Sequence, residues 1–146
     1  MIPKAEWVGL IPHRGAMCLL DEVIGWDPTR IHARSRSHRS ADNPLRSDGI
    51  LRAVHLCEYG AQAMAVHGGL VAREAGTSAA PGFLVALRAV DLCAARIDDK
   101  AGSLDVNAER LLAGTAGWQY AFRVLHQDTV LAHGRATVMV ADVPRA

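Results

Sequence analysis

The sequence predicts an α+β fold in which an antiparallel sheet wraps around one long central helix. Residues 50–73 form a long alanine-rich, apolar stretch, as expected of a buried helix. Apolar and polar residues then alternate over 104–112, 118–126 and 129–140, which is typical of half-buried strands. With 146 residues, the chain can build one real core but not two ordinary ones, so we expect a single domain over 1–146.

The segment before the helix predicts a helical turn, two strands and a loop. Val8–Ile11 is followed by proline and fits a short turn. Residues 17–26 predict a first strand, and residues 30–38, which alternate small or apolar side chains with Arg and His, predict an edge-like second one. Residues 40–49 hold Asp, Asn, Pro, Ser and Gly, which favours a loop.

The central helix is expected over 50–73, with Asp48 or Ser47 as its N-cap. Residues 79–82 predict a turn, and residues 84–97 predict one long, irregular strand. Short polar turns between the later strands favour an antiparallel meander.

Composition limits the classes of partner. The chain is 50% hydrophobic and 21% charged, which indicates a globular protein. A formal net charge of +1 gives no overall field that would steer the protein to nucleic acid or to a membrane surface. Five arginines do cluster, which fits either a solvated edge strand or a landing patch for an acidic partner. These arginines are Arg30, Arg34, Arg36, Arg39 and Arg46.

The cysteines and the N-terminus suggest a soluble cytoplasmic protein. Cys18, Cys57 and Cys93 are odd in number and widely spaced, which argues against a disulfide framework and a zinc site. The N-terminus lacks the basic-then-apolar profile of a signal peptide. No uninterrupted apolar run approaches the ~20 residues that a membrane span needs.

Three polar side chains interrupt the apolar helix. His55, Glu58 and Gln62 are spaced three and four residues apart, which places them on one stripe of a helix. A carboxylate in a buried helix is costly unless it is paired or has a task. Glu58 therefore fits either a proton-transfer group or a structural carboxylate paired with His55 or an arginine.

Two blocks of sequence resemble the bacterial 3-hydroxyacyl-acyl-carrier-protein dehydratases. The string Ile11–Asp21 (IPHRGAMCLLD) resembles that family's start, where Pro-His-Arg precedes a leucine-rich strand ending in Asp. Glu58–Ala65 (EYGAQAMA) resembles its central helix, where a catalytic carboxylate precedes an Ala-x-x-Gln-Ala-like run. The order and spacing of the blocks match as well. The resemblance covers about residues 8–75 by motif and the rest by strand pattern.

This resemblance implies a hotdog fold, with a sheet curled around a central helix. It also implies a homodimer, or a larger oligomer of dimers, whose active sites lie where two subunits meet. The implied substrate is a 3-hydroxyacyl thioester on acyl carrier protein or coenzyme A. It would lose water across C2–C3 to give a trans-2-enoyl thioester in fatty-acid or polyene-type synthesis. No metal and no bound organic cofactor are implied.

The catalytic residues carry over only in part. Glu58 matches the family's carboxylate and would serve as the acid, but the family's His-Phe-Pro-Gly turn, with its catalytic histidine, has no match. His55, one helical turn from Glu58, is one candidate base. His13, in the Pro-His-Arg block, could shape the pocket floor, reach the partner's site or, as such polar groups commonly do, anchor the first strand.

Other residues of this region are expected to bind substrate. Backbone N–H groups at the helix start, in Gly49, Ile50 and Leu51, could receive the thioester oxyanion, and Gly49 would let a ligand approach. Gln62 lies on the stripe of Glu58. Small residues over 60–65 either allow close packing or leave room for an acyl chain.

Two other functions remain open on this fold. The missing histidine fits a non-catalytic hotdog subunit that binds acyl carrier or supports an active paralogue in a mixed oligomer. A helix carboxylate could instead activate water, which would make the protein an acyl thioesterase.

Overall fold

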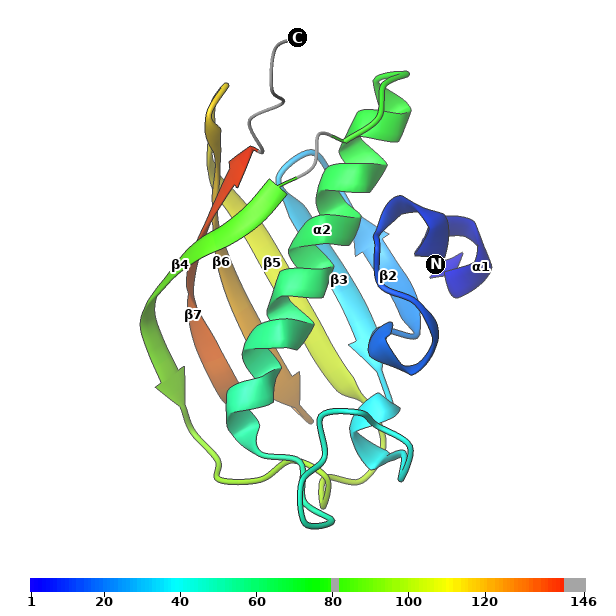
Figure 1. Ribbon diagram of the computed structural model, residues 1–146, viewed down its shortest axis with the longest axis vertical. Helices are drawn as coiled ribbons and strands as arrows, with labels where there is room; N and C mark the ends of the chain where they lie inside the picture. The colour runs from blue at the N-terminus through cyan, green and yellow to red at the C-terminus, as the bar shows by residue number, and fades with distance from the viewer. Residues whose placement is uncertain (80–81, 141–146) are drawn as a thin grey trace, which may run out of the picture.

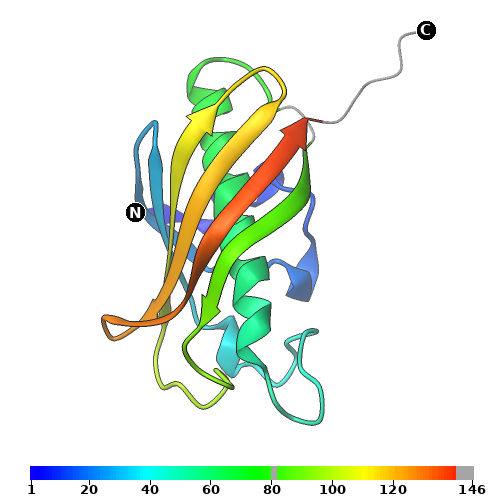
Figure 2. The same cartoon turned by 90° about the vertical axis from the view of Figure 1, so that its left-hand side faces the viewer.

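A seven-stranded antiparallel sheet curls along one side of a single long helix, α2 (Leu56–Glu74) (Figures 1 and 2). The structure is a computed structural model that describes residues 1–79 and 82–140. Its strand order is β1-β2-β3-β5-β6-β7-β4. The predicted α+β architecture, a sheet wrapped around one central helix, is confirmed.

The strands are β1 (Ile2–Pro3), β2 (Glu22–Trp26), β3 (Arg30–Ser35), β4 (Gly82–Leu92), β5 (Leu104–Ala113), β6 (Gly117–His126) and β7 (Thr129–Val140). A short helix, α1 (Lys4–Trp7), precedes a 3-10 turn at Val8–Leu10. Within the described parts of the chain, neither helix is long and apolar enough to cross a membrane.

The later strands follow the predicted alternation, but β4 does not lie beside β5, its successor in sequence, as a simple meander would require. β5, β6 and β7 form the expected meander, and Leu104, Val106 and Ala108 of β5 are buried. β4 pairs with β7 at the sheet edge, because β3 takes the place beside β5. The first strand begins at Glu22 rather than at residue 17, since a 3-10 turn occupies Gly15–Met17. Two of the four residues predicted to turn at 79–82 lie outside the described ones.

The central helix begins six residues later than predicted. Asp48 and Gly49 both have positive φ, +55° and +74°, which reverses the chain instead of starting a helix. A 3-10 turn at Ala53–His55 follows, and His55 occupies the N-cap position of α2 without a side-chain capping bond. The prediction of Asp48 or Ser47 as the N-cap is therefore wrong.

The core lies between α2 and the concave face of the sheet. Tyr59, Val66 and Leu70 of α2 are at most 1% exposed. A Cβ at Gly60 would stand 2.7 Å from ring atoms of Phe122 on β6, so this glycine lets the helix approach the sheet closely. The small residue at this position therefore serves packing.

Candidate active site

Two side chains that are distant in sequence meet beside α2. The Nε2 atom of His13 lies 3.1 Å from Oε1 of Glu58, within hydrogen-bond distance. The two side chains are 25% and 34% exposed, so they are partly withdrawn from water. His13 belongs to the loop before the 3-10 turn Gly15–Met17, which folds back onto the first turn of the helix. Both residues belong to the same chain.

Gln62 holds the carboxylate of Glu58 in place. The backbone N–H of Leu19 donates to Oε1 of Gln62 at 2.8 Å, which fixes the orientation of the amide. Nε2 therefore donates to the carbonyl of Met17 at 2.7 Å and to Oε1 of Glu58 at 3.2 Å. Gln62 is fully buried and does not line the pocket described below. The structure thus gives Gln62 a positioning role in place of the predicted contact with substrate.

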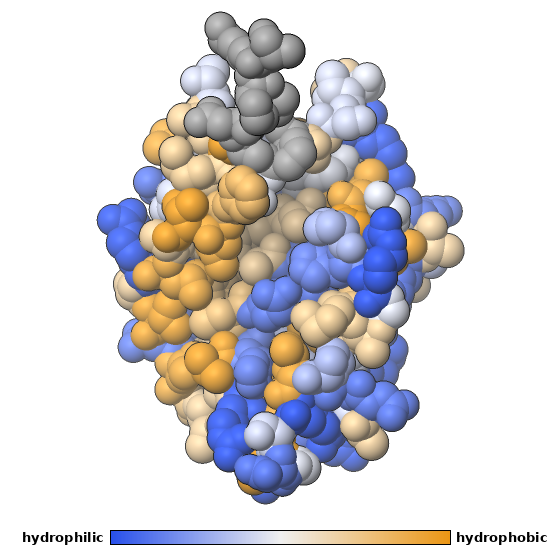
Figure 3. Space-filling view, viewed as in Figure 1, coloured by the Kyte–Doolittle hydropathy of each residue, from blue (hydrophilic) through white to orange (hydrophobic). Residues whose placement is uncertain are grey.

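An apolar pocket of about 490 Å³ opens beside the His13–Glu58 pair. The small residues Ala61, Ala65 and Gly68 form its helix wall, and Leu84 of β4 and Val138 of β7 lie on the sheet side. From Glu58 to Gly68 the helix rises by about 15 Å, which makes the pocket long enough for an extended chain. In Figure 3 the surface is hollowed between β4 and α2. The arrangement suits a slender apolar ligand with its reactive end at Glu58.

His55 lies apart from this site. It belongs to the 3-10 turn before α2 and is not among the residues that line the pocket. Its side chain makes no hydrogen bond or ion pair within residues 1–79 and 82–140, and none to Glu58. The stripe expected of a continuous helix from residue 50 is broken, because α2 begins only after His55.

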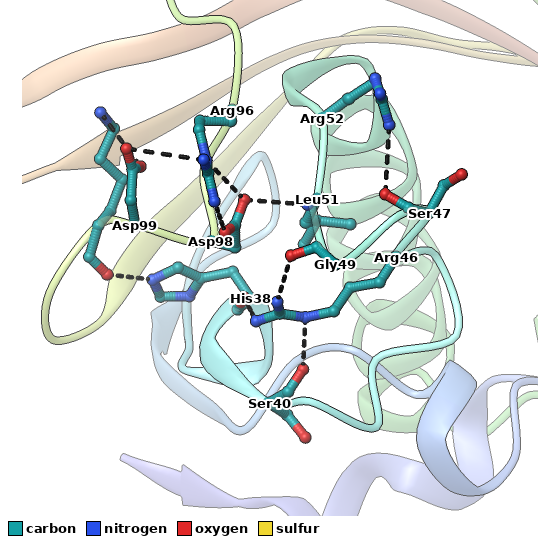
Figure 4. Close-up of polar contacts among 11 residues, drawn as sticks. His38, Ser40, Arg46, Ser47, Gly49, Leu51, Arg52, Arg96, Asp98 and Asp99 are labelled. Carbon is teal, nitrogen blue, oxygen red and sulfur yellow. Dashed lines mark hydrogen bonds and ion pairs between the residues drawn. The ribbon is translucent and has the colours of Figure 1, made fainter.

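Two of the three backbone donors expected to receive an oxyanion, the N–H groups of Ile50 and Leu51, are already occupied. The N–H of Ile50 donates to the carbonyl of Ser47 at 3.0 Å. Figure 4 shows the second bond, in which the N–H of Leu51 donates to Oδ1 of Asp98 at 2.9 Å. A hydrogen bond from the Arg96 guanidinium holds the pKa of Asp98 well below its usual range, so the acceptor stays charged.

Gly49 contributes its carbonyl to the loop, because this oxygen accepts a hydrogen bond from Arg46 at 3.1 Å (Figure 4). None of the three residues Gly49, Ile50 and Leu51 lines the pocket. The prediction that they contact substrate disagrees with this arrangement, because the chain reverses at Asp48 and Gly49 and pairs with the segment around Asp98 instead.

Much of the predicted arginine cluster serves the fold. Arg30 pairs with Glu109 at 2.9 Å, and Arg34 lies 3.3 Å from Asp105. Arg46 donates to the backbone carbonyls of His38, Ser40 and Gly49, which ties the loop before α2 together. These contacts favour the structural interpretation of the cluster over a landing patch.

The far end of the pocket carries polar groups that sequence reasoning missed. Arg110, Trp118 and Tyr120 line it near Gly68. The signal was present in the strand pattern, since Arg110 continues the buried face of Leu104, Val106 and Ala108 at a period of two. Within the described parts of the chain, no three His, Cys, Asp or Glu side chains are grouped as metal ligands would be.

Comparison with known proteins agrees with this architecture. A model of the ApeP-like family, described as ApeP dehydratase, matches residues 6–146. No curated protein matches the chain. A chain of the dehydratase heterocomplex ApeI:P from Xenorhabdus doucetiae is similar in structure, with a TM-score of 0.83 and 24% identity. This similarity covers 97% of the present chain and 93% of that one.

Two further structures resemble this chain less closely. AziG from S. sahachiroi has a TM-score of 0.60 and 16% identity, over 97% of this chain and 98% of its own. A hypothetical thioesterase from Streptococcus pneumoniae TIGR4, solved with coenzyme A, also has a TM-score of 0.60, with 12% identity over 85% and 88%. At these identities the likeness establishes the fold, and the predicted hotdog fold is confirmed.

Proposed function

The chain belongs to the ApeP-like dehydratase family, and from that premise we propose that it removes water from 3-hydroxyacyl thioesters to give trans-2-enoyl thioesters. The observation that carries this proposal is the His13–Glu58 pair, 3.1 Å apart at one end of a long apolar pocket. An imidazole and a carboxyl group in contact are the two groups that this elimination needs, a base and an acid.

The reaction breaks the C2–H and C3–O bonds of the substrate and forms a C2–C3 double bond. We assign His13 as the base that takes the C2 proton. We assign Glu58 as the acid that gives a proton to the C3 hydroxyl, which leaves as water. The proton held by His13 is then returned to the carboxyl group of Glu58, which lies 3.1 Å away, and both groups recover the charge they had before the turnover.

The hydrogen bonds of Glu58 favour this assignment. Its Oε1 atom contacts Gln62 and His13, whereas Oε2 makes no hydrogen bond to a described residue. Oε2 is therefore the oxygen available to the departing hydroxyl. Gln62 is itself held by the backbone at Met17 and Leu19, so the carboxylate keeps one orientation through the cycle.

We propose that a second hotdog subunit, a copy or a related chain, covers β4. This edge strand pairs only with β7 among the described strands and exposes large apolar side chains. Phe83 is 63% exposed, Val85 54% and Leu87 40%, and hydrophobic side chains gather over β4 at the left of Figure 3. A long apolar edge of this kind is a template for pairing with another chain.

A related subunit is a specific alternative to a second copy. The Xenorhabdus doucetiae structure is described as a dehydratase heterocomplex, and its fold matches this one over nearly the whole chain. If the present protein acts in such a pair, its pocket would hold the acyl chain of substrates that either subunit dehydrates. The substrate would arrive on acyl carrier protein or coenzyme A.

Product analysis with a small panel of 3-hydroxyacyl thioesters tests the proposal. Mass spectrometry of the purified protein with each thioester should show the loss of one water molecule. Release of the acyl group would instead indicate a thioesterase. No change with the protein alone, followed by water loss after a related dehydratase subunit is added, would indicate a supporting subunit.

A further inference from the structure

The pocket ends in a charged group that the proposed dehydration does not use. Arg110 lies at the level of Gly68, where a Cβ would stand 4.0 Å from its Nη2 atom. Gly68 is ten residues from Glu58 along α2, so about 15 Å separates the two levels. The helix wall between them carries only small or apolar residues, among them Ala61, Met64 and Ala65.

A chain of hydrogen bonds fixes the guanidinium of Arg110. Nε of Arg110 donates to the hydroxyl of Tyr120 at 3.1 Å, and this hydroxyl lies 2.8 Å from Nδ1 of His67. Nε2 of His67 is 2.8 Å from the carbonyl of Asp27, which can only accept. Nε2 therefore carries the proton, Nδ1 accepts, and the Tyr120 hydroxyl donates to it.

The surroundings of His67 and Arg110 keep this series of hydrogen bonds in one protonation state. His67 is fully buried, and burial lowers its pKa, which favours the neutral imidazole that the chain requires. The guanidinium also lies over two rings, 5.6 Å from the Trp118 centroid and 5.5 Å from the Tyr120 centroid. Arg110 is thus held in place on one side by partners that leave its terminal nitrogens unused.

The two Nη atoms of Arg110 have no hydrogen bond or ion pair among the described residues. Arg30 and Arg34, on the same sheet, instead pair with Glu109 and Asp105. A guanidinium at the end of an apolar pocket, with no carboxylate partner within residues 1–79 and 82–140, presents directed N–H donors and a positive charge to whatever fills the pocket. Packing against the rings alone would not need a charged group on the buried face of β5.

We propose that Arg110 recognises the far end of the acyl chain, and that the preferred substrates carry an oxygen acceptor there. This inference rests on the proposed dehydration, which places the thioester end of the substrate at Glu58. At roughly 1.2 Å per bond for an extended chain, about a dozen bonds separate the reacting carbons from that oxygen. Two groups have the required chemistry, a neutral hydroxyl and a carboxylate.

Binding of unreactive ligands tests this inference independently of catalysis. We would use saturated acyl pantetheine thioesters of one length that end in a methyl, a hydroxyl or a carboxylate group. The full-length protein, with its partner subunit if one co-purifies, should bind at least one of the oxygen-ended ligands about 10-fold or more tightly than the methyl-ended one. A preference for the carboxylate alone identifies an ion pair, and a preference for both identifies a hydrogen bond.

Arg110→Met should weaken binding of the preferred ligand by about 10- to 100-fold and change that of the methyl-ended one little. Arg123→Met, an exposed arginine on β6, is the matched control and should change neither. Tyr120→Phe keeps the ring but removes the hydroxyl that anchors Nε, so it should reduce the preference even if Arg110→Met does not fold.

Equal binding of all three ligands by the wild-type protein would overturn the inference. An equal loss of affinity for all three ligands in Arg110→Met would also overturn it. Such a result would mean that the arginine contacts the pantetheine group that the ligands share, or that it only packs against its neighbours. If no thioester is dehydrated but oxygen-ended ligands still bind more tightly, the proposed reaction fails and the role of Arg110 stands.

Discussion

At the scale of single residues, Glu58 and His13 could both be singled out from the sequence, but the contact between them could not be predicted. The position of Glu58 in an apolar helix predicted that it is either paired or a proton-transfer group, because buried carboxylates are costly. The local spacing of three residues favoured His55 as the partner. The structure places His13 there instead, 45 residues away in sequence, which helical periodicity cannot reveal.

Gln62 is predicted to support both the fold and the carboxylate. Gln62→Leu would leave the N–H of Leu19 and the carbonyl of Met17 without their buried partner, which costs about 1–3 kcal/mol for each unpaired group. Glu58 would also lose one of its hydrogen bonds, so the dehydration rate should fall. Urea unfolding and steady-state kinetics measure the two effects.

Gln119→Leu is the matched control, because Gln119 on β6 makes no side-chain hydrogen bond to a described residue. It should change the free energy of unfolding by less than about 0.5 kcal/mol. Wild-type stability and rate in Gln62→Leu would contradict the positioning role.

At the scale of elements, strand alternation was a good guide and the helix start was not. Leu104, Val106 and Ala108 follow a period of two because one face of β5 packs on α2. The stretch at residues 50–55 is as apolar as the helix proper, so its composition could not separate them. Residues 50–55 stay outside the helix because the backbone turns back at Asp48 and Gly49, where φ is positive. Hydrophobic periodicity carries no information about such a turn.

The two glycines that face the sheet from α2 are predicted to respond in opposite ways to alanine. In Gly60→Ala the new methyl group would overlap the Phe122 ring at 2.7 Å, which should destabilise the fold by about 1–3 kcal/mol. In Gly68→Ala the nearest atom is Nη2 of Arg110 at 4.0 Å, so the gain in helix propensity, about 0.5–1 kcal/mol, should dominate. Chemical denaturation compares them, and equal shifts would refute this account of the helix packing.

At the scale of the whole molecule, the exposed β4 edge predicts assembly with another subunit. A lysine at position 85 would place a charge on this apolar edge, so Val85→Lys should dissociate the assembled protein. Light scattering after size-exclusion chromatography reports the mass. Leu112→Lys, at a 60% exposed position on β5, is the control and should keep the wild-type mass. An assembled Val85→Lys protein would rule out β4 as the interface.

Two buried histidines predict how stability depends on pH. Burial lowers the pKa of both His38 and His67 in the folded protein. The unfolded chain then binds more protons than the folded one, so stability is full above about pH 6.5 and falls as the pH drops toward the lower folded values. Thermal unfolding between pH 5 and 8 should show this decline, and a constant melting temperature over that range would contradict it.

The proposed dehydration requires Glu58 and His13 to carry its protons. The most direct measurement is the rate of water loss from a 3-hydroxyacyl thioester by Glu58→Gln, which keeps the shape of the side chain and removes its acid. We predict a fall of about 100-fold or more, with unchanged melting temperature and assembly, and a similar fall in His13→Asn. A Glu58→Gln protein that dehydrates the thioester at the wild-type rate would contradict the claim.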